Sequence, residues 1–188
     1  MHPSHGPLGR QRRAGVRARQ GGFTLLELMV TLAVLAILVS LATPSFTAVI
    51  NGNRLTAQAN DLVADIQLAR SEAVRRNRTV RLCRSEDGAS CADGEGNWTG
   101  WIVMLPGADP EVLRVATVKG AVEVSGGDTM NFRPDGLARD DTGSLLATTF
   151  TVCLPTTRPA ENVRQVDVAG GSRINTVVAS HATPGECP

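Results

Sequence analysis

The 188-residue sequence contains no tyrosine, two tryptophans and four phenylalanines, so aromatic residues make up only 3% of it. A hydrophobic core must therefore be built mainly from valine, leucine, isoleucine and alanine. The sequence also lacks GxSxG, HExxH and P-loop motifs, and Gly94-Glu95-Gly96 does not complete a dinucleotide-binding fingerprint. After residue 22 the only histidine is His181. We therefore expect neither enzymatic activity nor a cofactor.

The four cysteines contain no CxxC pair, which argues against a zinc site. An even number of cysteines in an oxidising compartment indicates two disulfides, and four cysteines allow three pairings. We expect Cys83–Cys91, which closes a short loop, and Cys153–Cys187, which ties down the tail. The alternative is four free thiols in a cytosolic protein.

Charged residues are unevenly distributed along the chain, and residues 28–53 contain none. Five arginines and no acidic residue precede Phe23, namely Arg10, Arg12, Arg13, Arg17 and Arg19. The rest of the chain has 14 basic and 18 acidic residues, which argues against nucleic-acid binding through bulk charge and leaves only a local basic patch. Arginines before an apolar segment hold its N-terminal end in the cytoplasm, so the chain after the segment is expected across the membrane.

The longest apolar run extends from Leu28 to Ile50, where the only polar side chains are small hydroxyls. About 20 residues are enough to cross the hydrocarbon core, so residues 23–50 are a predicted transmembrane half-helix. Pro44 is expected to kink or loosen it. Glu27 costs about 2.5–3.5 kcal/mol on insertion scales, so we expect it to have a partner. A cleaved signal peptide and a plain signal anchor are the alternatives, but a signal peptide has a shorter apolar run.

The stretch Gly22-Phe23-Thr24-Leu25-Leu26-Glu27 resembles the class III signal of type IV pilins and pseudopilins. The resemblance implies that a prepilin peptidase removes residues 1–22, a cytoplasmic leader, by cutting between Gly22 and Phe23. The same enzyme would then N-methylate Phe23. A 22-residue leader is long for a major pilin.

The resemblance also assigns roles to two residues inside the apolar segment. Glu27 becomes the fifth residue of the processed chain, where the family has a glutamate that pairs with the new amine of a neighbouring subunit. Burial would make such a pair depend strongly on both partners. Pro44 falls where many members carry a helix-loosening proline. The alternative for Glu27 is a carboxylate that merely lies at the level of the lipid headgroups.

Residues 51–78 are predicted to continue the helix as an amphipathic half. An apolar stripe with alternating spacings of four and three consists of Leu55, Ala59, Leu62, Ile66, Ala69 and Ala73. One long helix is therefore expected from about Thr24 to Asn77, with its second half packed on the folded domain. Asn51-Gly52-Asn53 is expected to weaken this helix near the membrane.

Residues 79–188 are predicted to form a β-rich globular domain in the periplasm. The candidate strands are Thr79–Cys83, Trp101–Leu105, Val112–Val118, Ala121–Val124, Thr129–Phe132, Thr148–Leu154, Val163–Val168 and Arg173–Ala179. Gly126-Gly127-Asp128 and Pro134-Asp135-Gly136 are turn signals. The predicted fold class is α+β and type IV pilin-like, with a long N-terminal helix packed on antiparallel β-sheet.

Further segments resemble the GspH/FimT group of minor pilins and minor pseudopilins. They are Ala57-Gln58-Ala59-Asn60-Asp61-Leu62, Leu68-Ala69-Arg70-Ser71-Glu72-Ala73, Asn97-Trp98-Thr99-Gly100-Trp101-Ile102-Val103 and Phe132-Arg133-Pro134-Asp135-Gly136. The resemblance implies a single-pass inner-membrane subunit of a type II secretion pseudopilus or a type IV pilus tip. Its partners would be prepilin peptidase and other pilins or pseudopilins. Trp98 and Trp101 are expected to be structural.

DNA uptake is the alternative function. Some members of the FimT branch bind DNA through a C-terminal Gly-Arg-x-Arg loop, and the corresponding place here reads Gly170-Gly171-Ser172-Arg173-Ile174-Asn175. Arg173 matches one arginine, whereas the second position is an asparagine, so phosphate binding should be weaker. Arg158 and Arg164 would add to a basic patch if they face the same way. The alternative is that Arg173 is an ordinary surface arginine in a hairpin.

Overall fold

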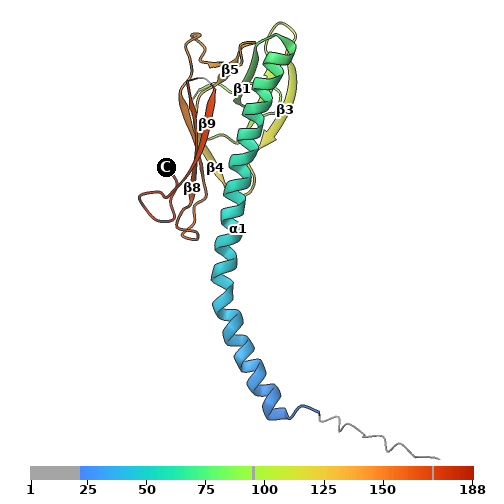
Figure 1. Cartoon of the computed structure of the whole chain (residues 1–188), viewed down its shortest axis with the longest axis vertical. Coiled ribbons are helices and arrows are strands. Elements are labelled where there is room, and N and C mark those ends of the chain that lie inside the picture. The colour runs from blue at the N-terminus through green and yellow to red at the C-terminus, as the bar shows by residue number, and fades with distance from the viewer. Residues whose placement is uncertain (1–21, 95, 171) are drawn as a thin grey trace, which may run out of the picture. The chain divides into compact units, whose positions relative to one another are not determined.

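The computed structural model describes residues 22–94, 96–170 and 172–188, without the side chains of residues 41–45. The chain divides into two compact units, Met1–Ser40 and Leu41–Pro188. The predicted leader, apart from Gly22, lies outside the described residues. Figure 1 shows the described chain as one long helix and a set of strands.

Helix α1 extends from Leu25 to Arg76, within a residue of the prediction at each end. Its C-terminal end is closed by Asn77, which has a positive φ of 52°. The backbone N–H of Arg78 donates to the carbonyl of Ala73 (3.3 Å), and that of Asn77 donates to the carbonyl of Val74 (3.4 Å). These two bonds form a Schellman motif, which satisfies carbonyls left open at a helix end.

The β-rich part of the second unit contains two antiparallel sheets. The first has the order β3-β2-β1-β5-β6 and is built from β1 (Val80–Arg84), β2 (Gly100–Leu105), β3 (Glu111–Thr117), β5 (Met130–Phe132) and β6 (Ala138–Arg139). The second has the order β4-β7-β8-β9 and is built from β4 (Glu123–Gly126), β7 (Thr148–Cys153), β8 (Val163–Ala169) and β9 (Arg173–Ala179).

The C-terminal half of α1 and both sheets share one hydrophobic core. The predicted apolar stripe of α1, from Leu55 to Ala73, is at most 1% exposed at all six positions. Every residue of β2 is buried, and Trp101, Phe132 and Phe150 are the largest fully buried side chains. The stripe therefore holds the helix on the sheets, as expected from its spacing.

One predicted strand is displaced along the chain, and one strand of the structure has no predicted counterpart. Ala121–Val124 is displaced to β4, because a turn at Gly120 (φ 66°) and a bond from the N–H of Val122 to the carbonyl of Lys119 (3.4 Å) delay strand pairing. Strand β6 was not predicted at all, since it has only two residues and pairs with β5 after the tight turn that ends at Leu137.

The expectation that residues 51–53 weaken the helix is not tested and stays a prediction, although the helix continues through them. The Asn51 side chain holds a loop, because its Nδ2 donates to the backbone carbonyl of Arg158 (2.8 Å) and to the Thr156 hydroxyl (3.4 Å). Gly52 faces Pro159 of the same loop, and a Cβ there would be in ordinary van der Waals contact with the proline ring.

Candidate functional site

The first turn of α1 begins directly after the predicted cleavage site. Gly22, Phe23 and Thr24 precede the helix, and Phe23 is 84% exposed. The Thr24 hydroxyl accepts a hydrogen bond from the backbone N–H of Glu27 (3.1 Å), as an N-cap residue does. Threonine followed three residues later by glutamate is the capping-box pattern, so this helix start has a local signal in the sequence. The peptide bond after Gly22 therefore lies in exposed backbone outside the helix.

The Glu27 side chain is exposed at this end of α1. Its carboxylate makes no hydrogen bond or ion pair to any residue that the structure describes. The first turn carries the positive end of the helix dipole, which favours a carboxylate there. Glu27 thus combines a local reason to lie in the first turn with a carboxylate that is free to pair with another molecule.

The helix surface after Glu27 is apolar on all sides. The segment from Leu28 to Ser40 contains no charged residue. Its large apolar side chains are all at least 50% exposed. The hydroxyls of Thr31 and Ser40 donate to the backbone carbonyls of Leu28 (2.8 Å) and Ile37 (2.7 Å), so they present little free polarity. Such a surface is suited to an apolar environment.

Among the described residues, no helix meets the length and apolarity expected of a membrane span. The predicted span over residues 23–50 is therefore not confirmed and stays a prediction. The same holds for the kink at Pro44. Residue 44 is helical, but its side chain lies outside the described part of the chain.

A buried carboxylate fixes α1 to β2 and β3. Asp65 is 4% exposed and accepts a hydrogen bond from the indole Nε1 of Trp101 at 2.9 Å. Its second oxygen forms an ion pair with the Arg114 Nε at 3.3 Å, and the Arg114 side chain is 56% exposed. Trp101 is thus a core anchor with a satisfied polar atom, in agreement with its predicted structural role.

A second polar contact joins α1 to the segment after β3. The Gln58 side-chain oxygen accepts the backbone N–H of Lys119 (3.1 Å), and the Lys119 Nζ pairs with Asp61 (3.0 Å). The Gln58 Nε2 is buried without a protein partner in the described structure. These contacts fix the position of α1 along its axis relative to the segment that follows the edge strand β3.

Both predicted disulfides are present, Cys83–Cys91 and Cys153–Cys187. The second fastens the C-terminal tail beside Asn162, which is 1% exposed. The Asn162 Nδ2 donates to the carbonyls of Leu154 (3.1 Å) and Glu186 (2.9 Å). The tail is therefore part of the folded domain.

The first disulfide closes a loop that is also organised by a carboxylate. Asp87 accepts hydrogen bonds from the backbone N–H groups of Ser90 (2.9 Å) and Ala89 (2.8 Å), and from the Ser90 hydroxyl (2.7 Å). These donors, the Ser90 amide first among them, hold the pKa of the Asp87 carboxyl well below its usual range.

The structure does not gather the three candidate DNA-binding arginines on one surface. Arg164 is only 9% exposed, and its Nη1 donates to the carbonyls of Glu161 and Val163, both at 2.9 Å. Arg173 is exposed at the opposite end of the β8–β9 pair, five residues further along the register. At about 3.3 Å per residue this is roughly 16 Å. Arg164 is therefore removed from the predicted patch, because it is buried and its Nη1 is bonded to backbone carbonyls.

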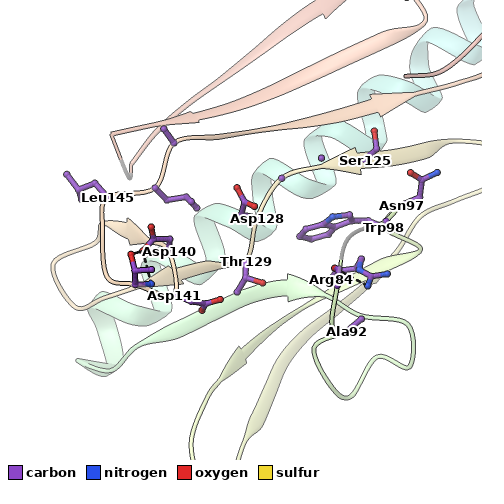
Figure 2. A pocket seen from close by; sticks show the side chains of 17 residues that line it. Arg84, Ala92, Asn97, Trp98, Ser125, Asp128, Thr129, Asp140, Asp141 and Leu145 are labelled. Atoms are coloured by element: carbon purple, nitrogen blue, oxygen red, sulfur yellow. Dashed lines mark hydrogen bonds between the residues drawn. The ribbon is translucent and has the colours of Figure 1, made fainter.

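A groove of about 1040 Å³ opens between the two sheets (Figure 2). Asp140 and Asp141 lie at one end of it and Arg84 at the other. Trp98, at its wall, is 5% exposed and packs edge-on against Phe150, with ring centroids 5.1 Å apart. Trp98 is thus a core residue, as predicted, and the groove brings together none of the predicted assembly residues.

Two family models match the chain. One, described as type II transport protein GspH, matches residues 58–172, which is more than half of the chain. The other, described as a prokaryotic N-terminal methylation motif, matches residues 17–43 and therefore includes Gly22, Phe23 and Glu27. None of the curated proteins matches the sequence.

Solved structures to which the chain is similar include a minor pilin in two crystal forms and a minor pseudopilin. Type IV minor pilin FimU of Pseudomonas aeruginosa is 21% identical, covers 66% of this chain and 89% of its own, and has a TM-score of 0.50. A second crystal form of FimU gives 19% identity, coverage of 65% and 91%, and a TM-score of 0.48. The minor pseudopilin EpsH of the Vibrio cholerae type 2 secretion system gives 11% identity, coverage of 66% and 97%, and a TM-score of 0.48. The first of these supports the fold alone.

Proposed function

Because the chain belongs to the type II transport protein GspH family and carries the N-terminal methylation motif, we propose that it is cleaved after Gly22, methylated at Phe23 and assembled into a filament through α1. Members of this family are structural subunits, and the chain is a minor pilin or pseudopilin, not an enzyme. The observation that carries the proposal is the helix start, where an exposed cleavage site adjoins an unpartnered carboxylate.

Cleavage before Phe23 creates an α-amino group one residue before the helix cap. The amine is a single positive charge on a chain end that projects from the first turn of α1, near Glu27. Methylation leaves this charge in place. In a neighbouring subunit the same amine supplies the partner that the Glu27 carboxylate lacks among the described residues of its own chain.

The apolar surface of α1 determines where this pairing takes place. Within lipid, or among the helices of a filament, an ionised Glu27 without a partner costs about 2.5–3.5 kcal/mol on insertion scales. Pairing with an amine offsets this cost only when the second subunit is in register. The carboxylate therefore favours assembled subunits over isolated ones and selects one axial offset between them.

The processing step is tested by intact-mass and N-terminal peptide analysis of the protein extracted from membranes. We expect a chain that begins at Phe23 and carries one additional methyl group. Cells without prepilin peptidase are the control and should yield the chain with its leader. A chain that begins at Met1 in peptidase-containing cells, or one cut beyond residue 50, contradicts the proposal.

The assembly step is tested with Glu27→Gln, which keeps the size and removes the charge. We expect normal cleavage and membrane extraction but strongly reduced recovery in sheared filaments. Glu161→Gln is a matched control, because Glu161 is an exposed glutamate outside α1 whose carboxylate, like that of Glu27, makes no described hydrogen bond or ion pair. Equal incorporation of the Glu27 variant and wild type would refute the pairing role. Complementation of a secretion mutant and of a pilus mutant then identifies which of the two filaments incorporates the chain.

A further inference from the structure

A small pocket of about 200 Å³ lies at the end of the globular domain where α1 terminates. Its lining comes from the start of β1 and from the β5–β6 hairpin with the loop that follows. The residues are Thr79, Arg81, Asn131, Arg133, Arg139, Asp140, Asp141, Thr142 and Gly143. Strand pairing places Arg81 opposite Asn131 and Asn131 opposite Arg139, so two of the three arginines are held by the sheet itself.

The pocket contains donors that nothing in the described chain uses. Arg133 is exposed, and its side chain makes no hydrogen bond or ion pair to the described residues. Arg139 donates through Nη1 to the carbonyl of Gly143 (3.1 Å) and through Nη2 to Asp135 (3.0 Å), whereas its Nε is buried and has no partner. A buried donor without an acceptor costs about 1–3 kcal/mol, but this Nε is inaccessible, so the donor open to a ligand is the exposed Arg133 guanidinium.

The acidic residues of the pocket limit the charge that it accepts. Asp141 accepts from Asn131 (2.9 Å) and Arg81 (3.4 Å), and Asp140 accepts from Thr142. Three guanidinium groups and two carboxylates line the pocket, but Arg81 pairs with Asp141 and Arg139 pairs with Asp135 just outside it, so Arg133 is the lining guanidinium without a described ion pair. This balance suits a ligand with a single negative charge, whereas a second charge would meet the two aspartates.

The backbone keeps the Arg133 guanidinium accessible. Its Nη2 lies 3.2 Å from the position that a Cβ on Gly143 would occupy, and Gly143 has a φ of 91°. Only glycine adopts this conformation readily, and a side chain here would crowd the guanidinium. Gly143 thus leaves room beside the Arg133 side chain, which is exposed.

We propose that this pocket binds the carboxylate of a glutamate or aspartate side chain from a neighbouring filament subunit. The inference rests on the proposed function, since it names a second contact between subunits. Filaments are built from head-to-tail contacts, in which one end of a subunit meets a different surface of the next. A pocket at the end of the domain where α1 terminates is placed for such a contact. Its volume accommodates a side chain and not a folded segment.

The pocket chemistry is tested on the full chain in a non-ionic detergent, so the result does not depend on assembly. The probe is N-acetyl-glutamate methylamide, and its uncharged counterpart is N-acetyl-glutamine methylamide. We expect the glutamate probe, at constant ionic strength, to protect Arg133 from phenylglyoxal, as mapped by peptide mass spectrometry. Arg173, which is exposed on β9, should react equally with and without the probe.

Variants connect the protection to binding. Arg133→Gln should weaken binding of the glutamate probe about tenfold or more, measured as the shift in unfolding temperature with probe concentration. Arg133→Lys, which keeps the charge but not the fork, should weaken it less, and Arg173→Gln should have no effect. Neither Arg133 nor Arg173 makes a described side-chain hydrogen bond or ion pair, so all three variants should unfold at the wild-type temperature without probe.

Three outcomes would overturn the proposal. Equal protection by the glutamine probe would show that charge is not recognised. Tighter binding of inorganic phosphate than of the glutamate probe would assign the pocket to a doubly charged ligand. Normal recovery of Arg133→Glu in filaments, relative to Arg173→Glu, would exclude the subunit contact even if the probe binds. None of these results affects the cleavage and Glu27 experiments, so the two proposals fail separately.

Discussion

The contact between Asp65 and Trp101 allows a quantitative test of how α1 is held on the sheets. In Asp65→Ala the indole Nε1 of Trp101, a fully buried residue, loses its acceptor. An unsatisfied buried donor costs about 1–3 kcal/mol, and the removed carboxyl group leaves a small cavity that adds about 1 kcal/mol. We therefore expect a loss of about 2–4 kcal/mol in the free energy of unfolding. That is a large share of the roughly 5–15 kcal/mol that a domain has.

Two further variants separate the hydrogen bond from the ion pair. Asp65→Asn keeps an oxygen that can accept from Trp101 and loses only the charge opposite Arg114. Since the Arg114 side chain is more than half exposed, the ion pair contributes at most about 1 kcal/mol. Asp65→Asn and Arg114→Ala should therefore each cost about 1 kcal/mol or less.

The measurement is urea unfolding of the full chain in neutral detergent, followed by tryptophan fluorescence, because both tryptophans are buried. The slope of the free energy against urea should not change between variants. A loss under 0.5 kcal/mol for Asp65→Ala would refute the role of the buried hydrogen bond. An equal loss for Asp65→Asn and Asp65→Ala would show that the charge, and not the acceptor, stabilises the contact.

Three other predictions concern the folded domain. The hydrogen bonds that lower the pKa of Asp87 stabilise the fold fully above its ordinary pKa, near 3.9, and this contribution is lost as the pH falls below it, so Asp87→Asn should unfold with less acid dependence between pH 5 and 2. Replacing Cys153 and Cys187 together by serine, which opens a bridge across 34 positions, should cost about 3–4 kcal/mol in urea unfolding. Ala69→Leu, at a fully buried position of α1, should lower stability by about 1–3 kcal/mol, whereas Ala64→Leu, at an exposed position, should change it little.

Features with a short-range physical cause were predictable from the sequence. The apolar stripe from Leu55 to Ala73 follows from helical periodicity, and it is buried as expected. The start of α1 is also local, since Thr24 caps the first turn through the N–H of Glu27. The cysteine pairing could be predicted because the first bridge is short and the second closes the tail.

Features that depend on distant neighbours were not predictable in the same way. Strand β6 has only two residues and forms because it pairs with β5, so no pattern in its own sequence predicts it. Arg164 reads as a surface cation in the sequence, yet the fold buries it and turns its guanidinium to carbonyl groups. Arg133 and Arg139 have no special spacing, and they meet Arg81 only through strand pairing and a hairpin.

The sequence by itself determined the N-terminal methylation motif, the carboxylate at position 27 and the apolar stripe of the helix, because each depends on residues within a few positions of one another. Only the tertiary structure decided which arginines are free to bind. The sequence does not show which acceptors surround an arginine side chain, because the fold places either acceptors or solvent around its guanidinium group. Strand register and loop closure set these surroundings, and both depend on contacts between residues far apart in the sequence.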